Sequence, residues 1–565
     1  MARMTMRALS AQWLLAVVGF GLLAGCDSRA ETDRESPGTT SGVSAETSGG
    51  PGAAEMPGDA GATLDPGHRL AQGTEFMVAA PTPEAMEAGR VVLENGGNAV
   101  DAAAATAIAL WVTDPLMSSV GGRAQILIRL ADGTVVGIDG ATQAPLRVDE
   151  PAELGHGYGT APIPGAPAAL EEMLKDYGTL PLAQVMEPAI RLAEEGFVVK
   201  SDVHEYLRTY EDRLSLYSGT RTHFFKPDGS LYSEGDTLRQ PALATTLRAM
   251  AEAGTDALYR GPLADAIVAD MEEHGGLVQH DDLDQYRPLV GEVVRGEYRG
   301  HEIVARGGNC DGASVIQMLQ MLEHFDLGAY DPKDPEYVHI LAQTLHVGQG
   351  DEHVPDSVQV SADHAASRVR EIDLAGVLPP GTQGSPDGDT NHLSVVDGEG
   401  NAVAITQSIG PNFGSKVVNP ALGFFYAYSY DMNDDPVPFQ REKTSQSPTM
   451  ILEDGGPFLV LGSAGSSRIP GSIVRTAVNV IDHGLSLWDA VEAPRWFIAD
   501  GELRIESDEF SAEALDGLRG LGYVLQEYEG RDGYFARVHA VMADQRAGLL
   551  WGASDPRDLG AAGGR

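Results

Sequence analysis

The sequence DTNHLSVVD, at residues 389–397, begins the part of this chain that is most informative about its architecture. Residues 392–396 and 402–406 are predicted strands, and the turn residues 397–400 between them predict a β-hairpin. A second hairpin is predicted where residues 449–452 and 458–461 flank another glycine-rich turn. The chain is therefore strand-rich beyond residue 389.

Upstream of this segment the sequence predicts mostly helices. A short strand at 77–80 leads to Thr82, which caps a helix that runs to about Glu94. Asn98 caps a second helix over 99–112, which is apolar nearly all round and is expected to be buried. Other predicted elements are strands at 125–129 and 135–138 and helices at 168–176, 182–195, 242–253 and 470–483. Helices and antiparallel hairpins in separate runs predict an α+β layered fold.

The stretch at 389–397 resembles the processing site of the γ-glutamyltransferase family. Matching segments follow in order from Phe76 to the C-terminus: 94–103, 177–181, 187–197, 400–403, 406–408, 413–415, 462–469, 493–495 and 552–557. The resemblance implies a four-layer αββα sandwich of the N-terminal-nucleophile hydrolases. It also implies one precursor with a large-subunit region at 67–389 and a small catalytic region at 390–565.

The same resemblance implies that the chain cuts itself between Asp389 and Thr390. Cleavage makes Thr390 an N-terminus, whose α-amine has an ordinary pKa of about 7.7–8.0 and can take a proton from its own hydroxyl. Thr390 would then supply both nucleophile and base. The uncut form has no such amine and is expected to be inactive.

Three further residues match the catalytic machinery of that family. Ser408 stands where the family has a threonine that hydrogen-bonds the nucleophile, and it keeps the hydroxyl. Gly465 and Ser466 match the Gly-Gly pair whose backbone N–H groups form the oxyanion hole. Losing one such N–H donor costs about 10²–10³ in rate.

Four residues match the part of the family's site that holds the acyl donor. Thr444 and Ser445 replace a Ser-Ser pair that contacts the donor's α-carboxylate. Ser429 and Asp431 lie in the segment that contacts its α-amino group, and Asp431 is the expected partner of the ammonium.

The chain departs from the family at two positions that contact the donor. Ala141 stands where the family has an arginine for the α-carboxylate, and Gly410 replaces an asparagine. A hydrogen bond to a charged group is worth about 1.5–3 kcal/mol, so these changes put glutathione in doubt as the substrate. Arg123 is either a substitute cation or an arginine with a structural or surface position.

The first residues are expected to be a targeting signal rather than part of the folded domain. Residues 1–25 have the basic start and apolar run of a signal peptide, and they end in a lipobox-like sequence before Cys26. The resemblance to bacterial lipoproteins implies lipidation of Cys26 and export to the cell envelope. Residues 26–66 lack large apolar side chains and are expected to be a disordered tether.

Composition excludes one class of partner. Among 565 residues, 39 Lys and Arg face 82 Asp and Glu, a net charge of −43, which argues against nucleic acid. No cofactor or metal is expected, because the spacing of His346, His353 and His364 fits no metal signature and better fits a solvated acidic loop. Cys310 is read as a buried thiol rather than a nucleophile.

Three functions remain open at this point. One is an amidase that forms a γ-glutamyl ester on Thr390 and passes it to water, an amine or a peptide. Another is an acylase of the same fold with a different acyl specificity. The third is a non-catalytic binding protein of the envelope.

Overall fold

The computed structural model describes residues 68–147, 155–351, 353–378, 389–428 and 437–565. Ser429, Asp431, Cys26 and the predicted signal peptide and tether lie outside the described residues.

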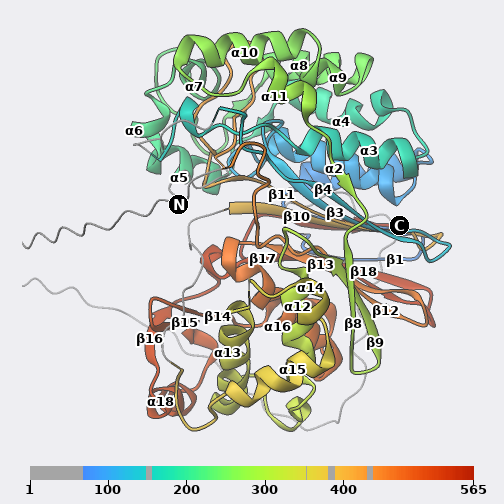
Figure 1. Cartoon of the computed structure of the whole chain (residues 1–565), viewed down its shortest axis with the longest axis vertical. Coiled ribbons are helices and arrows are strands. Elements are labelled where there is room, and N and C mark those ends of the chain that lie inside the picture. Colours follow the sequence, from blue (N-terminus) through green and yellow to red (C-terminus); the bar gives the residue numbers. More distant parts are fainter. Residues whose placement is uncertain (1–67, 148–154, 352, 379–388, 429–436) are drawn as a thin grey trace, which may run out of the picture. The chain divides into compact units, whose positions relative to one another are not determined.

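Two seven-stranded sheets, antiparallel in every pairing, form the centre of the described chain (Figure 1). The first, called the β10 sheet, has the strand order β19 (Ala561–Gly564), β2 (Phe76–Ala80), β10 (Asp389–Asp397), β11 (Ala402–Gly410), β3 (Arg123–Arg129), β4 (Val135–Gly140) and β7 (Leu289–Val290). The second, called the β13 sheet, has the order β1 (Leu70–Gly73), β18 (Leu549–Ser554), β17 (Arg537–Asp544), β13 (Gly456–Ala464), β12 (Thr449–Glu453), β9 (His301–Arg306) and β8 (Val293–Tyr298).

The two sheets face each other across an apolar layer. Leu127 and Val396 of the β10 sheet belong to the same buried cluster as Met450, Val460 and Val541 of the β13 sheet. Since side chains alternate along a strand, the other residues of the β10 sheet face the opposite way, toward helices.

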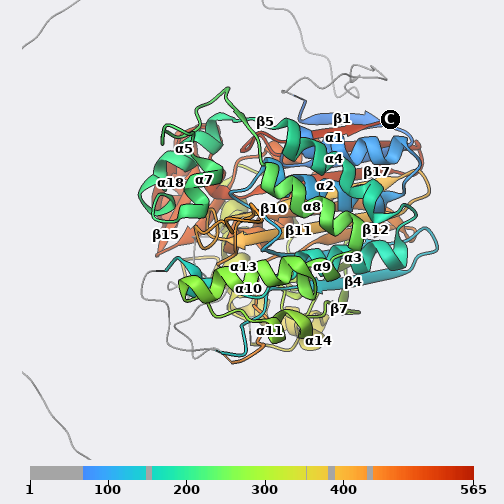
Figure 2. The same ribbon diagram turned by 90° about the horizontal axis from the view of Figure 1, so that it is seen from above.

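Helices cover both outer faces (Figure 1), and Figure 2 shows the helices over the β10 sheet from above. The β10 sheet is covered by α1 (Pro83–Glu94), α2 (Ala99–Thr113), α3 (Ala166–Tyr177) and α4 (Leu182–Glu195), which pack with α8 (Pro241–Ala253) and α10 (Pro262–His274). The β13 sheet is covered by α12 (Gly312–Leu322), α13 (Pro335–Gln349), α16 (Ile469–Ile481) and α17 (Leu487–Glu492). This arrangement confirms the predicted αββα sandwich.

Shorter elements fill the periphery. They are α5 (Ser201–Thr209), α6 (Glu211–Leu214), α7 (Ser218–Phe224), α9 (Asp256–Tyr259), α11 (His280–Gln285), α14 (Asp356–Gln359), α15 (Ala362–Arg368), α18 (Ala512–Leu521), the β5–β6 pair (Phe197–Val198, Thr237–Leu238) and the sheet of β14 (Trp496–Ala499), β15 (Glu502–Glu506) and β16 (Val524–Tyr528). No helix among the described residues is long and apolar enough to cross a bilayer.

Local sequence signals place α1 and α2. The Thr82 hydroxyl accepts the N–H of Ala85 at 3.2 Å, and Asn98 with Asp101 forms a reciprocal capping box at the start of α2. All of α2 is buried, as its apolar sequence predicts. These caps explain why both helices begin at the predicted residues.

Each sheet contains strands from both sides of residue 390. In the β10 sheet, residues 394–397 of β10 pair with β2, and residues 402–408 of β11 pair with β3, so the predicted catalytic region is joined to the predicted large-subunit region by two strand pairings. The division at 389/390 stays a prediction about a chain cut, and it does not separate two folding units.

Candidate active site

Thr390 lies at the start of β10 and is only 4% exposed. Along this strand Leu393 belongs to the helix-side core, whereas the Ser394 hydroxyl donates to the His539 carbonyl of the β13 sheet at 3.0 Å. Even-numbered residues of β10 therefore face the β13 sheet. Alternation puts the Thr390 side chain in the space between the two sheets.

A β-bulge lies at the predicted cleavage point. The register of β10 and β11 pairs Asp389 with Gly410 and resumes with Asn391 opposite Gln407. Two residues of β11 thus oppose Thr390 alone. Bulges redirect side chains and end pairing, and they are common next to active sites.

The extra backbone of β11 is held by segments distant in sequence. The Ile409 N–H donates to the Met117 carbonyl at 3.1 Å, and the Ile409 carbonyl accepts the Tyr428 N–H at 2.8 Å. The bulge is therefore fixed by tertiary contacts rather than by the hairpin turn.

Ser408 lies on β11 and faces the same inter-sheet space as Thr390. It is 1% exposed, and its hydroxyl accepts the Gly410 N–H at 2.9 Å. Because β10 and β11 are neighbouring strands, about 4.8 Å apart, this predicted pair lies on adjacent strands and faces the same space.

Gly465 and Ser466 form the turn between β13 and α16. Gly465 has φ 134°, and a Cβ at this position would lie 2.8 Å from the Cα of Ala536. Only glycine fits such a site without strain. Ser466 has φ 55° and begins the 3₁₀ turn that leads into α16, so its backbone lies near the positive end of a helix dipole.

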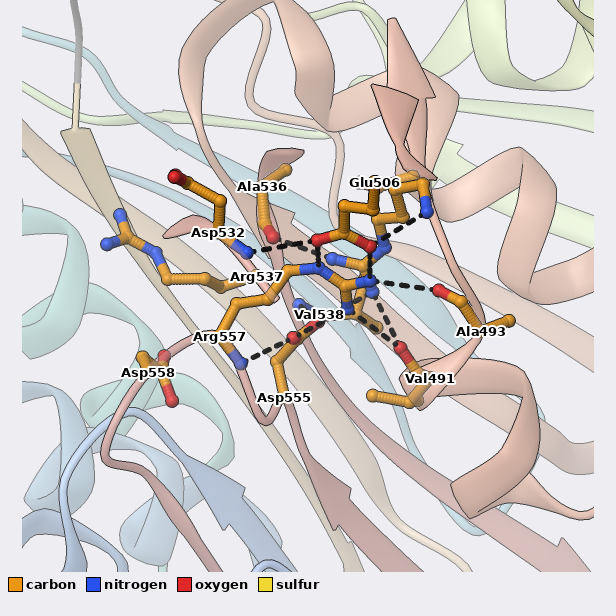
Figure 3. Close-up of polar contacts among 12 residues, drawn as sticks. Val491, Ala493, Glu506, Asp532, Ala536, Arg537, Val538, Asp555, Arg557 and Asp558 are labelled. Atoms are coloured by element: carbon orange, nitrogen blue, oxygen red, sulfur yellow. Dashed lines mark hydrogen bonds and ion pairs between the residues drawn. The ribbon is translucent and has the colours of Figure 1, made fainter. Parts of the chain in front are cut away.

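A buried ionic network holds Ala536 against this turn (Figure 3). The Arg495 guanidinium donates to the Ala536 carbonyl at 2.6 Å and pairs with the Asp555 carboxylate at 2.6 Å. Arg557 pairs with Asp555 at 3.0 Å and donates to Glu506 through Nε at 2.6 Å. Arg495 and Arg557 thus pair with Asp555 and Glu506 away from solvent.

Thr444 and Ser445 lie on the loop that precedes β12. Thr444 is 9% exposed, and its N–H donates to the Asn309 carbonyl at 2.8 Å, next to Cys310. The loop runs beside the segment that follows β9, because the Asn309 side chain also donates to the Glu442 carbonyl at 2.8 Å. Ser429 and Asp431, the remaining predicted contacts to the acyl donor, lie outside the described residues.

Gly410 leaves no room for a larger side chain in the present backbone. It has φ 89°, and a Cβ there would lie 1.7 Å from the Tyr428 carbonyl oxygen. Ala141 is fully buried, and its carbonyl accepts the Tyr286 hydroxyl at 2.8 Å. Both positions where the sequence departs from the family are therefore enclosed by neighbouring groups.

Arg123 is buried and forms an ion pair with Glu442. The Thr142 hydroxyl donates to the same Glu442 oxygen at 2.9 Å. The register of β11 and β3 pairs Arg123 with Ser408, so its side chain also faces the inter-sheet space. Because Arg123 is buried, the alternative that it is a surface arginine is excluded.

A small polar cavity beside Asn391 of β10 was not expected from the sequence. This cavity, of about 20 Å³, is lined by Asp114, Asn391, Arg537 and Asp558, among others. Burial and the nearby charge of Asp202 raise the pKa of Asp114 to about 8. The lining residues come from six separate segments of the chain, which explains why no sequence motif marks them.

The predicted solvated loop around residue 351 is in part wrong. Asp351 is buried, and its carboxylate accepts the Gln317 amide at 2.6 Å and lies 2.9 Å from His364 Nε2. It therefore ties α15 to α12. Cys310 is a buried thiol, and burial raises its pKa far above the ordinary value.

An αββα sandwich that carries a hydroxyl side chain at the start of a central strand defines the class of N-terminal-nucleophile hydrolases. The solved structure of a cephalosporin acylase from Bacillus halodurans superimposes with a TM-score of 0.81 at 29% identity, covering 90% of this chain and 99% of that chain. The fold prediction is thus confirmed.

The chain belongs to the gamma-glutamyltranspeptidase family, whose model matches residues 85–564. The glutathione hydrolase proenzyme of Escherichia coli (strain K12) is 32% identical over 86% of this chain and 90% of its own length. The Acylase ACY 1 proenzyme of Pseudomonas sp. (strain SE83) is 36% identical over 79% of this chain and 87% of its own length. The family prediction is confirmed, and this chain is an enzyme of the glutathione hydrolase and acylase kind.

Proposed function

We propose that this protein is a self-processing amidase that forms an acyl ester on Thr390. The observation that carries the proposal is the position of Thr390, buried between the sheets, beside Ser408 and opposite a bulge. The bulge of β11 interrupts regular pairing at Thr390, so the Asp389–Thr390 peptide bond lies where the strand ladder is disrupted and next to the Thr390 hydroxyl.

Processing follows from this position. The Thr390 hydroxyl oxygen attacks the carbonyl carbon of Asp389, and the peptide C–N bond breaks as the C–O bond of an ester forms. Water then hydrolyses the ester, which leaves a carboxylate on Asp389 and a free amine on Thr390. Relatives named as proenzymes support this step.

The amidase cycle uses the freed amine. It takes the hydroxyl proton while Thr390 Oγ attacks the acyl carbon of the substrate, and it returns the proton to the leaving amine nitrogen. The backbone N–H groups of Gly465 and Ser466, close to the start of α16, stabilise the oxyanion. Water or another amine then takes the acyl group and restores Thr390.

The leading acyl donor is a γ-glutamyl amide such as glutathione, with Thr444, Ser445, Ser429 and Asp431 as proposed contacts. A second candidate, an acylase for another side chain, is favoured by Ala141 and Gly410, which remove two polar contacts with a glutamyl group. Relatives with the names glutathione hydrolase and acylase support both.

A panel of acyl 4-nitroanilides separates these possibilities. Processed protein should release nitroaniline from at least one of γ-glutamyl, glutaryl and pentanoyl compounds, and a rapid quench should trap an ester on the fragment that contains Thr390. Failure of processed protein to turn over any of them would leave the non-catalytic binding protein as the better account.

We also propose export and anchoring to the bacterial envelope through a lipid on Cys26. The lipobox-like sequence before Cys26 supports this proposal. Metabolic labelling with a radioactive fatty acid should mark the wild-type chain and not Cys26→Ser. Equal labelling of both chains would exclude Cys26 as the anchor.

A further inference from the structure

Arg123 occupies a position in the inter-sheet space that suits it to select the acyl group. Thr390, Ser408 and Arg123 lie on the successive strands β10, β11 and β3 and face the same space. Two strand spacings, roughly 10 Å, separate the backbones of Thr390 and Arg123. An acyl group bound to Thr390 and extending along this row would meet the guanidinium.

The register places Ala141 beside Arg123. The pairing of β3 with β4 joins Ala124 to Gly140 and Gln125 to Asp139, so residue 141 follows at the level of Arg123. The small side chain of Ala141 leaves Arg123 as the cation at this level of the sheet among the described residues of β3 and β4.

The guanidinium retains hydrogen-bonding capacity. Its Nε is buried and has no hydrogen-bond partner among the described residues, although the group is paired with Glu442. A buried N–H without an acceptor is costly, and guanidinium groups bind carboxylates through two parallel hydrogen bonds. An incoming carboxylate would supply the missing acceptor.

Glu442 explains how the cation is kept buried when no substrate is present. Glu442 lies two residues before Thr444, on the loop that borders the proposed donor site, and Thr142 also donates to it. An unpaired buried charge is strongly destabilising, so the empty site requires a counter-ion of its own.

We propose that Arg123 selects acyl donors whose acyl group ends in a carboxylate, and that Glu442 occupies the guanidinium until such a donor binds. The inference rests on the proposed function and deepens it. It predicts that monoamides of short dicarboxylic acids are better donors than monoamides of fatty acids of the same length. In a chain with a net charge of −43, a local cation is needed to attract such a donor.

The test is the ratio of kcat/KM for glutaryl 4-nitroanilide to that for pentanoyl 4-nitroanilide. Both values come from one preparation, so the ratio does not depend on the processed fraction. Wild-type protein should prefer glutaryl, and Arg123→Gln should lower the ratio about tenfold to a hundredfold. Glu442→Gln, which removes the competing carboxylate, should raise the ratio.

Arg295→Gln is the matched control, since Arg295 pairs with Glu302 on an exposed hairpin. It should leave the ratio unchanged. If Arg123→Gln does not mature, Arg123→Lys is tested instead, and the measurement is the inhibition constant of free glutarate. Competitive inhibition by glutarate should weaken in this variant, because a lysine cannot form the two parallel hydrogen bonds of a guanidinium. An Arg123→Gln ratio within twofold of wild type, or an unchanged glutarate inhibition constant in Arg123→Lys, would overturn the inference.

Failure of the proposed function is distinguishable. Processed wild-type protein that hydrolyses no anilide contradicts the amidase itself. A wild-type enzyme that hydrolyses the anilides but prefers pentanoyl contradicts only the role of Arg123.

Discussion

Thr390 and Ser408 lie on adjacent strands, where two residues of β11 oppose Thr390. The Met117 carbonyl and the Tyr428 N–H, which bond to the Ile409 backbone, hold this bulge in place. The two hydroxyl groups are the candidate chemical groups, and backbone groups distant in the sequence determine the geometry around them.

Ser408→Ala should slow both processing and acyl transfer, by about threefold to tenfold, because one neutral hydrogen-bonding group next to Thr390 is lost. Processing can be followed by the rate at which the full-length band disappears on a denaturing gel. Ser408→Thr is the matched control and should behave like wild type. Unaltered rates in Ser408→Ala would exclude a contact between the two hydroxyl groups.

Gly410→Asn introduces the side chain that the family resemblance led us to expect. It should not create specificity for γ-glutamyl compounds, because its Cβ would overlap the Tyr428 carbonyl oxygen. We expect a loss of stability of about 1–3 kcal/mol, measurable by urea unfolding. A stable variant with improved γ-glutamyl turnover would show that the backbone at 410 can move away from Tyr428.

Secondary structure was predictable where short-range signals are strong. The caps at Thr82 and Asn98 place α1 and α2, and Gly455 places the hairpin of β12 and β13. The ion pair of Arg123 with Glu442 was not predictable, because the two residues are 319 positions apart in the chain. Burial of Asp351 was missed for a similar reason, since its partner Gln317 lies on another helix.

Asp555 connects β17 to Arg495 and Arg557, next to the turn that carries the proposed oxyanion hole. Its carboxylate accepts the Val538 N–H of β17 at 2.8 Å and binds Arg495 and Arg557. Asp555→Asn leaves two buried arginines with one carboxylate, Glu506, so it should reduce the free energy of unfolding by about 3–5 kcal/mol. Asp516→Asn, at an exposed ion pair on α18, is the control and should change stability by less than about 1 kcal/mol.

The pH dependence of stability has a defined sign at Asp555. Burial alone would raise the pKa of this carboxyl, but the charges of Arg495 and Arg557 lower it from 3.8 to about 2. A lowered pKa in the folded state stabilises the fold above the unfolded pKa, and that stabilisation, roughly 2–3 kcal/mol, is lost as pH falls from about 4 to 2. Urea unfolding between pH 2 and 5 should show a shallower acid loss in Asp555→Asn than in wild type. Parallel curves would contradict the assignment.

The whole molecule carries a net charge of −43, and its sequence pI is about 4.5. Self-repulsion at neutral pH opposes folding and is screened by salt. Raising NaCl from 50 to 500 mM at pH 7.5 should therefore raise Tm by a few degrees, and the effect should shrink near pH 4.5. A Tm that falls with salt at pH 7.5 would show that attractive ion pairs dominate.

Strand pairing across residue 390 determines what the predicted cleavage does to the folded molecule. Since β10 pairs with β2 and β11 pairs with β3, a break before Thr390 releases an amine without releasing a domain. The processed enzyme is therefore expected to remain one folded body of two chains. Size-exclusion chromatography under native conditions should give one peak that contains both fragments.

The masses of the purified protein show whether the chain cuts itself before Thr390 and uses Thr390 as its nucleophile. Wild-type protein should give two fragments, the smaller beginning Thr390-Asn391-His392, and Thr390→Ala should remain a single chain without amidase activity. A wild-type chain that stays whole yet hydrolyses acyl anilides, or an active Thr390→Ala variant, would contradict this account.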